Sequence, residues 1–323
     1  MSEPFSSYPL LMEPWLSARP WGGRRLESLG KVLPPDGGPW GEAWELSDHP
    51  DGLSRIANGP YQGLGFGELV RRHPEAIGRS EPVARFPLLV KYIDANEDLS
   101  IQVHPDDAHA PAGELGKTEC WYIMDCPRGA EIIHGLSGQI DAARLAEAAR
   151  LGKMEACIRR VPIKPGVLIQ IPAGTVHAIL GGTLLCEIQQ CSNTTYRLWD
   201  WDRKPARPLH VADACRVVDY AVASAAPVQT EPLEMNRWHT LAVNPYFEIA
   251  TFRMPAQRSE SIAVENPGGL ILNIVEGHGR MAAAGFEAPL ALGQTWFMPA
   301  GLEGWRFTTN SSPLRILASR SLE

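Results

Sequence analysis

The 323-residue sequence lacks any hydrophobic run that approaches the roughly 18 residues needed to cross a membrane. Its N-terminal segment, MSEPFSSYPLLMEPW, also lacks the basic start and apolar core of a signal peptide. An excess of positive charge is missing too, since the net charge is −7, which argues against sequence-independent binding to nucleic acid. None of the six cysteines forms a C-x-x-C pair or a zinc-ribbon spacing. These absences predict a cytoplasmic protein with reduced thiols that engages neither membranes nor nucleic acid.

Helical periodicity is scarce, whereas glycine and proline are frequent, with 30 and 28 residues. Many short strands joined by turns have this composition. One convincing helix is predicted at 140–154, with Ser137 as its N-cap and Gly152 as its stop, and a shorter helix at 64–80 is interrupted by Pro74. Apolar runs or alternation predict strands at 41–49, 87–95 and 99–105, and residues 236–323 are expected to form strands only.

A glycine–proline–glycine phrase occurs twice with the same spacing. The first copy, GVLIQIPAGTVH, ends in His177, whereas the second, GQTWFMPAGLEG, ends in Gly304. Two copies of one β-unit are therefore expected, with a helical segment (about 137–160) inserted into the first. We place a catalytic domain at 1–222, a Pro/Ala-rich linker at 220–235 and a second domain at 235–323. Because His278 in the second copy has no matching partners, that domain is expected to be metal-free.

Polar residues that can bind a metal interrupt the strands of the first copy. Gln102 and His104 lie two residues apart and therefore share one strand face, Glu119 opens a later strand, and His177 follows the Pro-Ala-Gly turn. One buried histidine is more often a hydrogen-bonded core residue than a ligand. Four such side chains on consecutive strands instead favour a metal site in a barrel mouth, and the set is compatible with zinc, iron or manganese.

The phrase G-x5-P-x-G-x2-H is the second cupin motif, and the chain resembles the short bacterial form of the type I mannose-6-phosphate isomerases. The resemblance covers most of residues 1–210 and includes GELGKTECWYI at 113–123 and IPAGTVHAI at 171–179. Its most specific segments are SIQVHPDD at 100–107 and TYRLWDWDR at 195–203. It implies a mainly β fold with two cupin-type jelly-roll barrels. It also implies a metal-dependent isomerase that interconverts mannose 6-phosphate and fructose 6-phosphate.

The resemblance assigns roles to individual residues. It implies one zinc ion bound by His104, Glu119 and His177, with Gln102 matching a fourth ligand of longer relatives. Arg197 matches the arginine regarded as catalytic in the family, and Lys91 and Lys117 match lysines that line the pocket. The sequence departs from the longer relatives at Gly116, where they have a histidine. If that histidine transfers the proton in them, this chain must use another group.

Several roles and functions remain open at the level of sequence. Lys117 can act as an acid or base if its pKa falls toward neutrality, or it can hold a phosphate, whereas phosphate or general electrostatics is favoured for Lys91. The alternative functions are an isomerase of a different aldose, a regulatory cupin that binds a sugar phosphate without turnover, and an iron-dependent cupin dioxygenase. The expected partner is a small sugar phosphate, and the chain is expected to be a monomer or a homodimer.

Overall fold

A computed structural model describes residues 4–221, 228–229, 233–262, 266–283, 285–302 and 304–323 of the chain. The fold is mainly β, with three α-helices in the described part: α1 (Phe66–Arg72), α2 (Ala142–Arg150) and α3 (Val211–Val217). Four short 3-10 helices lie at Arg25–Leu29, Gly59–Tyr61, Pro74–Ile77 and Met154–Ala156. Among the described residues, no helix is long and apolar enough to span a bilayer.

The first barrel consists of two antiparallel sheets. One has seven strands in the order β16 (Val228–Gln229), β12 (Val167–Ile171), β9 (Glu119–Asp125), β14 (Thr183–Gln190), β7 (Leu88–Ala95), β3 (Trp40–Leu46) and β2 (Trp15–Gly23). The other has five strands in the order β11 (Ile158–Pro162), β10 (Glu131–Leu136), β13 (His177–Ala178), β8 (Ile101–Val103) and β15 (Tyr196–Trp199). One apolar core joins them, with Ile93, Trp121 and Ile169 from the larger sheet against Ile132 and Val161 from the smaller.

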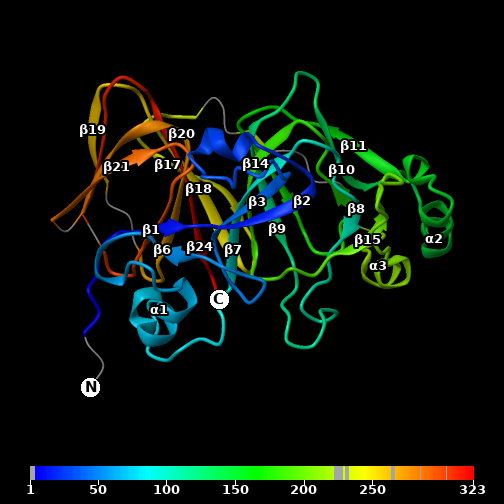
Figure 1. The fold of residues 1–323 in the computed structure, drawn as a ribbon, viewed down its shortest axis with the longest axis horizontal. Coiled ribbons are helices and arrows are strands. Elements are labelled where there is room, and N and C mark those ends of the chain that lie inside the picture. The colour runs from blue at the N-terminus through cyan, green and yellow to red at the C-terminus, as the bar shows by residue number, and fades with distance from the viewer. Residues whose placement is uncertain (1–3, 222–227, 230–232, 263–265, 284, 303) are drawn as a thin grey trace.

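The second barrel is built around a ten-stranded sheet, which lies on the left in Figure 1. Its main path runs through β17 (Trp238–Val243), β18 (Phe247–Met254), β24 (Leu314–Ser321), β20 (Leu270–Ala283), β22 (Thr295–Met298), β1 (Leu10–Glu13) and β6 (Arg55–Ile56). The strands β19 (Arg258–Ile262), β21 (Phe286–Ala291) and β23 (Trp305–Thr309) complete it, while β4 (Asp48–His49) pairs with β5 (Gly52–Leu53) elsewhere. Thus β1 and β6, from the N-terminal part of the chain, pair within the C-terminal barrel, and the domain limits at 222 and 235 stay a prediction.

The outer face of the seven-stranded sheet is buried against the second barrel. Val90 and Tyr92 of β7 belong to a core that also contains Ile271 and Leu317 of the second barrel. The residue between them, Lys91, points to the opposite face because side chains alternate along a strand. Both faces of β7 are therefore buried, which explains why the strand reads as an almost continuous apolar run. Lys91 therefore faces the interior of the first barrel.

The fold prediction is confirmed, with differences in its helices. Residues 64–80 form α1, which ends before Pro74, and a 3-10 helix follows. The N-cap of α2 is Asp141, whose side chain accepts a hydrogen bond from the Arg144 amide, so the prediction of Ser137 as the cap is wrong. Gly152 adopts a positive φ of 65° just after α2, as expected for a stop. Helix α3 was not predicted, and it lies beside α2 at the right-hand end of Figure 1.

Most of the predicted linker at 220–235 lies outside the described residues. Its described part includes β16, which pairs with β12 at the edge of the first barrel.

Candidate active site

Three strand ends bring the predicted metal ligands together. His104 directly follows β8, Glu119 opens β9 and His177 opens β13. The Gly174 amide donates to the His104 carbonyl oxygen at 2.9 Å, which fixes the turn before His177 against the end of β8. Gly174 has a φ of 85°, and an added Cβ would lie 3.0 Å from the Asp219 side chain, so the turn requires glycine. The turn formed by the first copy of the repeated phrase therefore places His177 beside His104.

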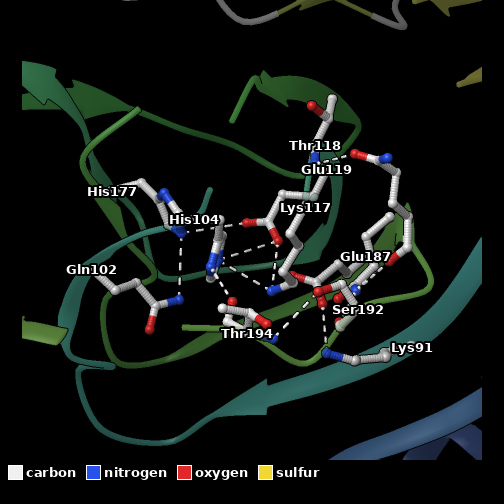
Figure 2. Close-up of polar contacts among 12 residues, drawn as sticks. Lys91, Gln102, His104, Lys117, Thr118, Glu119, His177, Glu187, Ser192 and Thr194 are labelled. Carbon is white, nitrogen blue, oxygen red and sulfur yellow. Dashed lines mark hydrogen bonds and ion pairs between the residues drawn. The ribbon is translucent and has the colours of Figure 1, made fainter. Parts of the chain in front are cut away.

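The ligand atoms of His104, Glu119 and His177 all lie within 4.8 Å of one another, and all three side chains are buried. Figure 2 shows them converging with Lys117. Glu119 Oε1 is 3.4 Å from His177 Nε2, and Glu119 Oε2 is 3.6 Å from His104 Nε2. Neighbouring ligands of a tetrahedral zinc ion are about 3.4 Å apart when each bond is near 2.1 Å. The spacing therefore fits a zinc-sized cation.

The two histidines present the ring nitrogen that a cation needs. His104 Nδ1 lies 2.8 Å from the Thr194 carbonyl oxygen, and His177 Nδ1 lies 2.8 Å from the Thr175 carbonyl oxygen. Each Nδ1 donates to its carbonyl, which leaves Nε2 as a lone-pair donor. Burial, assisted by the Lys117 ammonium, holds the pKa of His104 well below its usual value. Burial also lowers the pKa of His177 to about 3, so both rings are neutral.

Glu119 is fully buried; its Oε2 lies 2.9 Å from Lys117 Nζ, whereas its Oε1 accepts no hydrogen bond. Burial raises the pKa of Glu119 to about 7, even though the nearby Lys117 ammonium opposes the shift. Leaving an oxygen of a buried carboxylate without a hydrogen bond is costly unless a cation compensates it. Two neutral imidazoles and this carboxylate therefore form a donor set that fits a divalent metal.

Gln102 lies beside this set. Its Nε2 is 3.3 Å from His177 Nε2, and its Oε1 accepts a hydrogen bond from Ser100 Oγ at 3.2 Å. The β8–β13 pairing sets Gln102 directly opposite His177. The side chain thus touches the ligand set, and its role as a fourth ligand stays a prediction.

A cavity of about 200 Å³ adjoins the ligand set, because its lining includes Gln102 and Lys117, which contact His177 and Glu119. Five cationic side chains line it against two carboxylates: Arg19, Lys91, Lys117, Arg197 and Arg207 against Glu42 and Glu187. Within a protein whose net charge is −7, this cavity gathers local positive charge.

The two predicted lysines both pair with carboxylates. Lys91 Nζ is 3.1 Å from Glu187 Oε2 across the β7–β14 pairing, and it lies 5.0 Å from the centre of the Trp44 ring. Lys117 Nζ is 2.9 Å from Glu119 Oε2 and 3.1 Å from His104 Nε2. Burial lowers the pKa of Lys117, but Glu119 and Glu187 outweigh it and the pKa is raised. This direction is opposite to the fall toward neutrality considered from the sequence, which did not reveal Glu187.

Arg197 lies on β15, directly opposite Gln102 of β8. Its Nη1 donates to the Pro208 carbonyl oxygen at 3.0 Å, while its Nε is buried without a hydrogen-bond partner. No ion pair to Arg197 occurs within the part of the chain described here. Burial lowers its pKa, and the Arg207 guanidinium adds to the effect. By contrast, Arg207 Nε donates to Asp200 Oδ2 at 2.8 Å. The Arg197 guanidinium is therefore free to bind an anion.

Four charged residues of the cavity were not identified from the sequence: Arg19, Glu42, Glu187 and Arg207. Glu187 carried a detectable signal, because it interrupts an apolar strand that is buried along its whole length. Glu42 accepts from Arg19 Nη2 at 2.9 Å and from Trp44 Nε1 at 2.8 Å. Burial raises the pKa of Glu42, but Lys91 and Arg19 outweigh it and the net value falls to about 2.

His49, at the end of β4, contacts Glu114 Oε2 through Nε2 at 3.3 Å and accepts a hydrogen bond from the Asp51 amide at 3.2 Å. In the second barrel, the exposed His278 is hydrogen-bonded to Ser312 at 3.0 Å. Among the described residues, the one cluster with metal-ligand spacing is His104, Glu119 and His177. The metal-free state expected for the second barrel stays a prediction.

Comparisons with known proteins agree on one family. The model of the phosphomannose isomerase type I catalytic domain matches residues 10–125. A mannose-6-phosphate isomerase from Bacillus subtilis is 38% identical over 91% of this chain and 94% of its own length. A second, from Streptococcus mutans, is 34% identical over 98% of this chain and 99% of its own length.

Solved structures agree with these matches. The crystal structure of a mannose 6-phosphate isomerase from Bacillus subtilis superposes with a TM-score of 0.88 at 34% identity, covering 98% of this chain and all of that one. A mannose 6-phosphate isomerase bound with zinc and yttrium shares the fold, with a TM-score of 0.73 at 16% identity over 97% of this chain and 99% of its own. Because the sequence matches extend over nine-tenths or more of both partners, the chain belongs to the family of type I mannose-6-phosphate isomerases.

Proposed function

We propose that this chain interconverts mannose 6-phosphate and fructose 6-phosphate through an enediol. The observation that carries the proposal is the cluster of His104, Glu119 and His177 beside a cationic cavity that Gln102 and Lys117 help to line. The choice of mannose 6-phosphate as the substrate rests on the relatives, which are named as mannose-6-phosphate isomerases. The excess of positive side chains in the cavity suits a phosphorylated sugar, because an acidic protein otherwise repels an anion.

His104, Glu119 and His177 would hold the metal, with Gln102 beside them as a fourth candidate. A bound divalent ion would polarise the sugar oxygens at C1 and C2 as negative charge develops there. Arg197 supports the same charge from β15, because its fork of N–H donors carries no carboxylate partner among the described residues. We propose zinc, with iron or manganese as alternatives, because this donor set accepts each of them.

Proton transfer between C1 and C2 needs a group that can accept a proton and one that can donate it. Burial raises the pKa of Glu187, but the Lys91 and Lys117 ammonium groups outweigh it and the net value falls, so the carboxylate is ionised. The pKa of Lys117 is raised, so this lysine carries its proton. We therefore assign Glu187 as the acceptor and Lys117 as a donor or anion-binding group. Lys91 holds Glu187 in place and adds positive charge to the cavity.

The test is a panel of phosphorylated and free aldoses assayed for ketose formation with the metal-loaded chain. Turnover of mannose 6-phosphate well above the other sugars supports the proposal. Preferred turnover of another aldose identifies the isomerase of a different sugar. Tight binding of mannose 6-phosphate by calorimetry without product formation identifies the regulatory cupin instead.

The proposed setting of the enzyme is cytoplasmic carbohydrate metabolism. All six cysteines are free, as a reducing compartment would keep them. The proposed assembly is a monomer or a homodimer, which sedimentation of the purified chain distinguishes.

A further inference from the structure

The loop from Pro105 to Thr118 connects two metal ligands, because His104 precedes it and Glu119 follows it. Near the start of the loop, the carboxylate of Asp107 folds back onto the loop's own end. Its Oδ1 accepts a hydrogen bond from the Gly116 amide at 2.7 Å and another from Gln190 Nε2 at 3.1 Å. Asp107 itself is exposed, whereas Gly116 and Gln190 are buried. Asp107 is therefore the acceptor for two buried donors.

Gln190, the last residue of β14, completes the connection to Glu119. Its side-chain Oε1 accepts a hydrogen bond from the Thr118 backbone amide at 2.9 Å, and its backbone amide donates to the Thr118 carbonyl oxygen at 3.1 Å. The residues held in this way, Gly116 and Thr118, flank Lys117 on both sides. Asp107 and Gln190 together thus fix the backbone that carries Lys117 and Glu119.

The same contacts explain why Gly116 carries no side chain. A Cβ added there would lie 2.6 Å from the Asp106 carbonyl carbon and 2.6 Å from the Asp107 amide nitrogen. Contacts that short do not occur without movement of the backbone. Glycine at position 116 permits the two ends of the loop to meet. This contact accounts for a glycine where the longer relatives have a histidine.

These contacts lie behind the ligands, on the side of the sheet that faces the second barrel. Along β14, Gln190 follows the alternation of Cys186 and Ile188, which pack in the core between the barrels. Burial and the nearby Asp107 carboxylate raise the pKa of Tyr246, in the turn before β18, to about 12. The second barrel therefore lies close to the carboxylate that holds the ligand-bearing segment.

We propose that Asp107 and Gln190 are positioning residues that hold Lys117 and Glu119 in the geometry for metal binding and turnover. The inference rests on the proposed function, since the geometry concerns the same site. Partners that orient metal ligands from outside commonly change metal affinity or activity by about 10-fold to 100-fold when removed. Water can replace part of the hydrogen bonding at the exposed Asp107 side chain, so we expect its removal to weaken metal binding by about 10-fold.

The test compares Co²⁺ binding by the full chain, followed by the visible absorption of the bound ion, with kcat and KM for mannose 6-phosphate. Asp107→Ala and Gln190→Ala are expected to weaken Co²⁺ binding about 10-fold and to lower kcat, with KM within about twofold. Asp107→Asn keeps an acceptor oxygen and is expected to remain within about threefold of the unmodified chain. Asp106→Ala is the matched control, because the neighbouring Asp106 side chain accepts from exposed His109 instead.

Asp107→Ala and Gln190→Ala chains that bind Co²⁺ with unchanged affinity and spectrum would overturn the proposal. It would equally be overturned if Asp107→Asn were as weak as Asp107→Ala, or if Asp106→Ala showed the same loss. Thermal unfolding midpoints and circular dichroism verify that each variant is folded, and if one of the two alanine variants is not, the other carries the comparison. An unmodified chain that binds Co²⁺ but forms no fructose 6-phosphate refutes the proposed function, while the affinity comparison still decides this inference.

Discussion

Replacing Arg197 with alanine distinguishes the contribution of this residue to catalysis from its contribution to stability. The guanidinium makes one hydrogen bond, to the Pro208 carbonyl oxygen, and no ion pair within the described chain, so its loss should cost about 1 kcal/mol of unfolding free energy. If it stabilises charge that develops on the sugar oxygens, its removal should lower kcat by about 10²-fold to 10³-fold. That factor corresponds to about 3–4 kcal/mol, several times the cost to stability.

The assay for Arg197→Ala couples fructose 6-phosphate formation to a reporter and determines kcat and KM separately, alongside unfolding in urea. The control is Arg216→Ala, because Arg216 is an exposed residue of α3 that pairs with Asp213. We expect kcat to fall in the first variant alone, with KM within about threefold. A raised KM with unchanged kcat would mean uniform binding of ground and transition states, and would refute the role given to Arg197.

Three further predictions follow from individual contacts. His177→Ala removes one ligand and should abolish metal binding, whereas His278→Ala in the second barrel should retain one metal per chain. Elemental analysis measures both, and an equal metal content in the two variants would contradict the assignment. Lys91→Met should lower the unfolding free energy by about 3 kcal/mol in urea, because it leaves buried Glu187 without its cross-strand partner, and an unchanged midpoint would show that Lys117 alone compensates. The pKa of Glu42 is lowered from 4.5 to about 2, so its stabilisation, about 3 kcal/mol, is present above pH 4.5 and is lost as the pH falls toward 2. Glu42→Gln should therefore be less stable than the unmodified chain at pH 7 and nearly equal to it near pH 2, whereas a pH-independent difference would contradict this reading.

The part of the site that follows from local sequence pattern was predictable. His104 and Glu119 stand at strand ends, and the spacing of the repeated phrase sets His177 after a tight turn, so short-range geometry is enough to nominate them. Apolar runs and strand alternation likewise identified β3, β7 and β8 of the first barrel. The second phrase, ending at Gly304, correctly indicated a second β-barrel.

The features that depend on distant pairing were not predictable in this way. Glu187 meets Lys91 only because β14 pairs with β7 in one particular register, which no local pattern specifies. Arg19 and Arg207 enter the cavity from segments nearly 190 residues apart, and β1 joins a sheet formed mainly by residues beyond 235. The pKa of Lys117 was considered in the wrong direction partly for the same reason, since Glu187, which acts with Glu119 to raise it, lies on another strand.

The central claim is that a metal held by His104, Glu119 and His177 enables isomerisation of mannose 6-phosphate. The most direct measurement is the rate of fructose 6-phosphate formation by one preparation as purified, after chelation and dialysis, and after titration with Zn²⁺. The account predicts that activity is lost on stripping and returns in proportion to added zinc, up to about one ion per chain, as expected for a single three-residue site. Full activity in the rigorously stripped protein would contradict it.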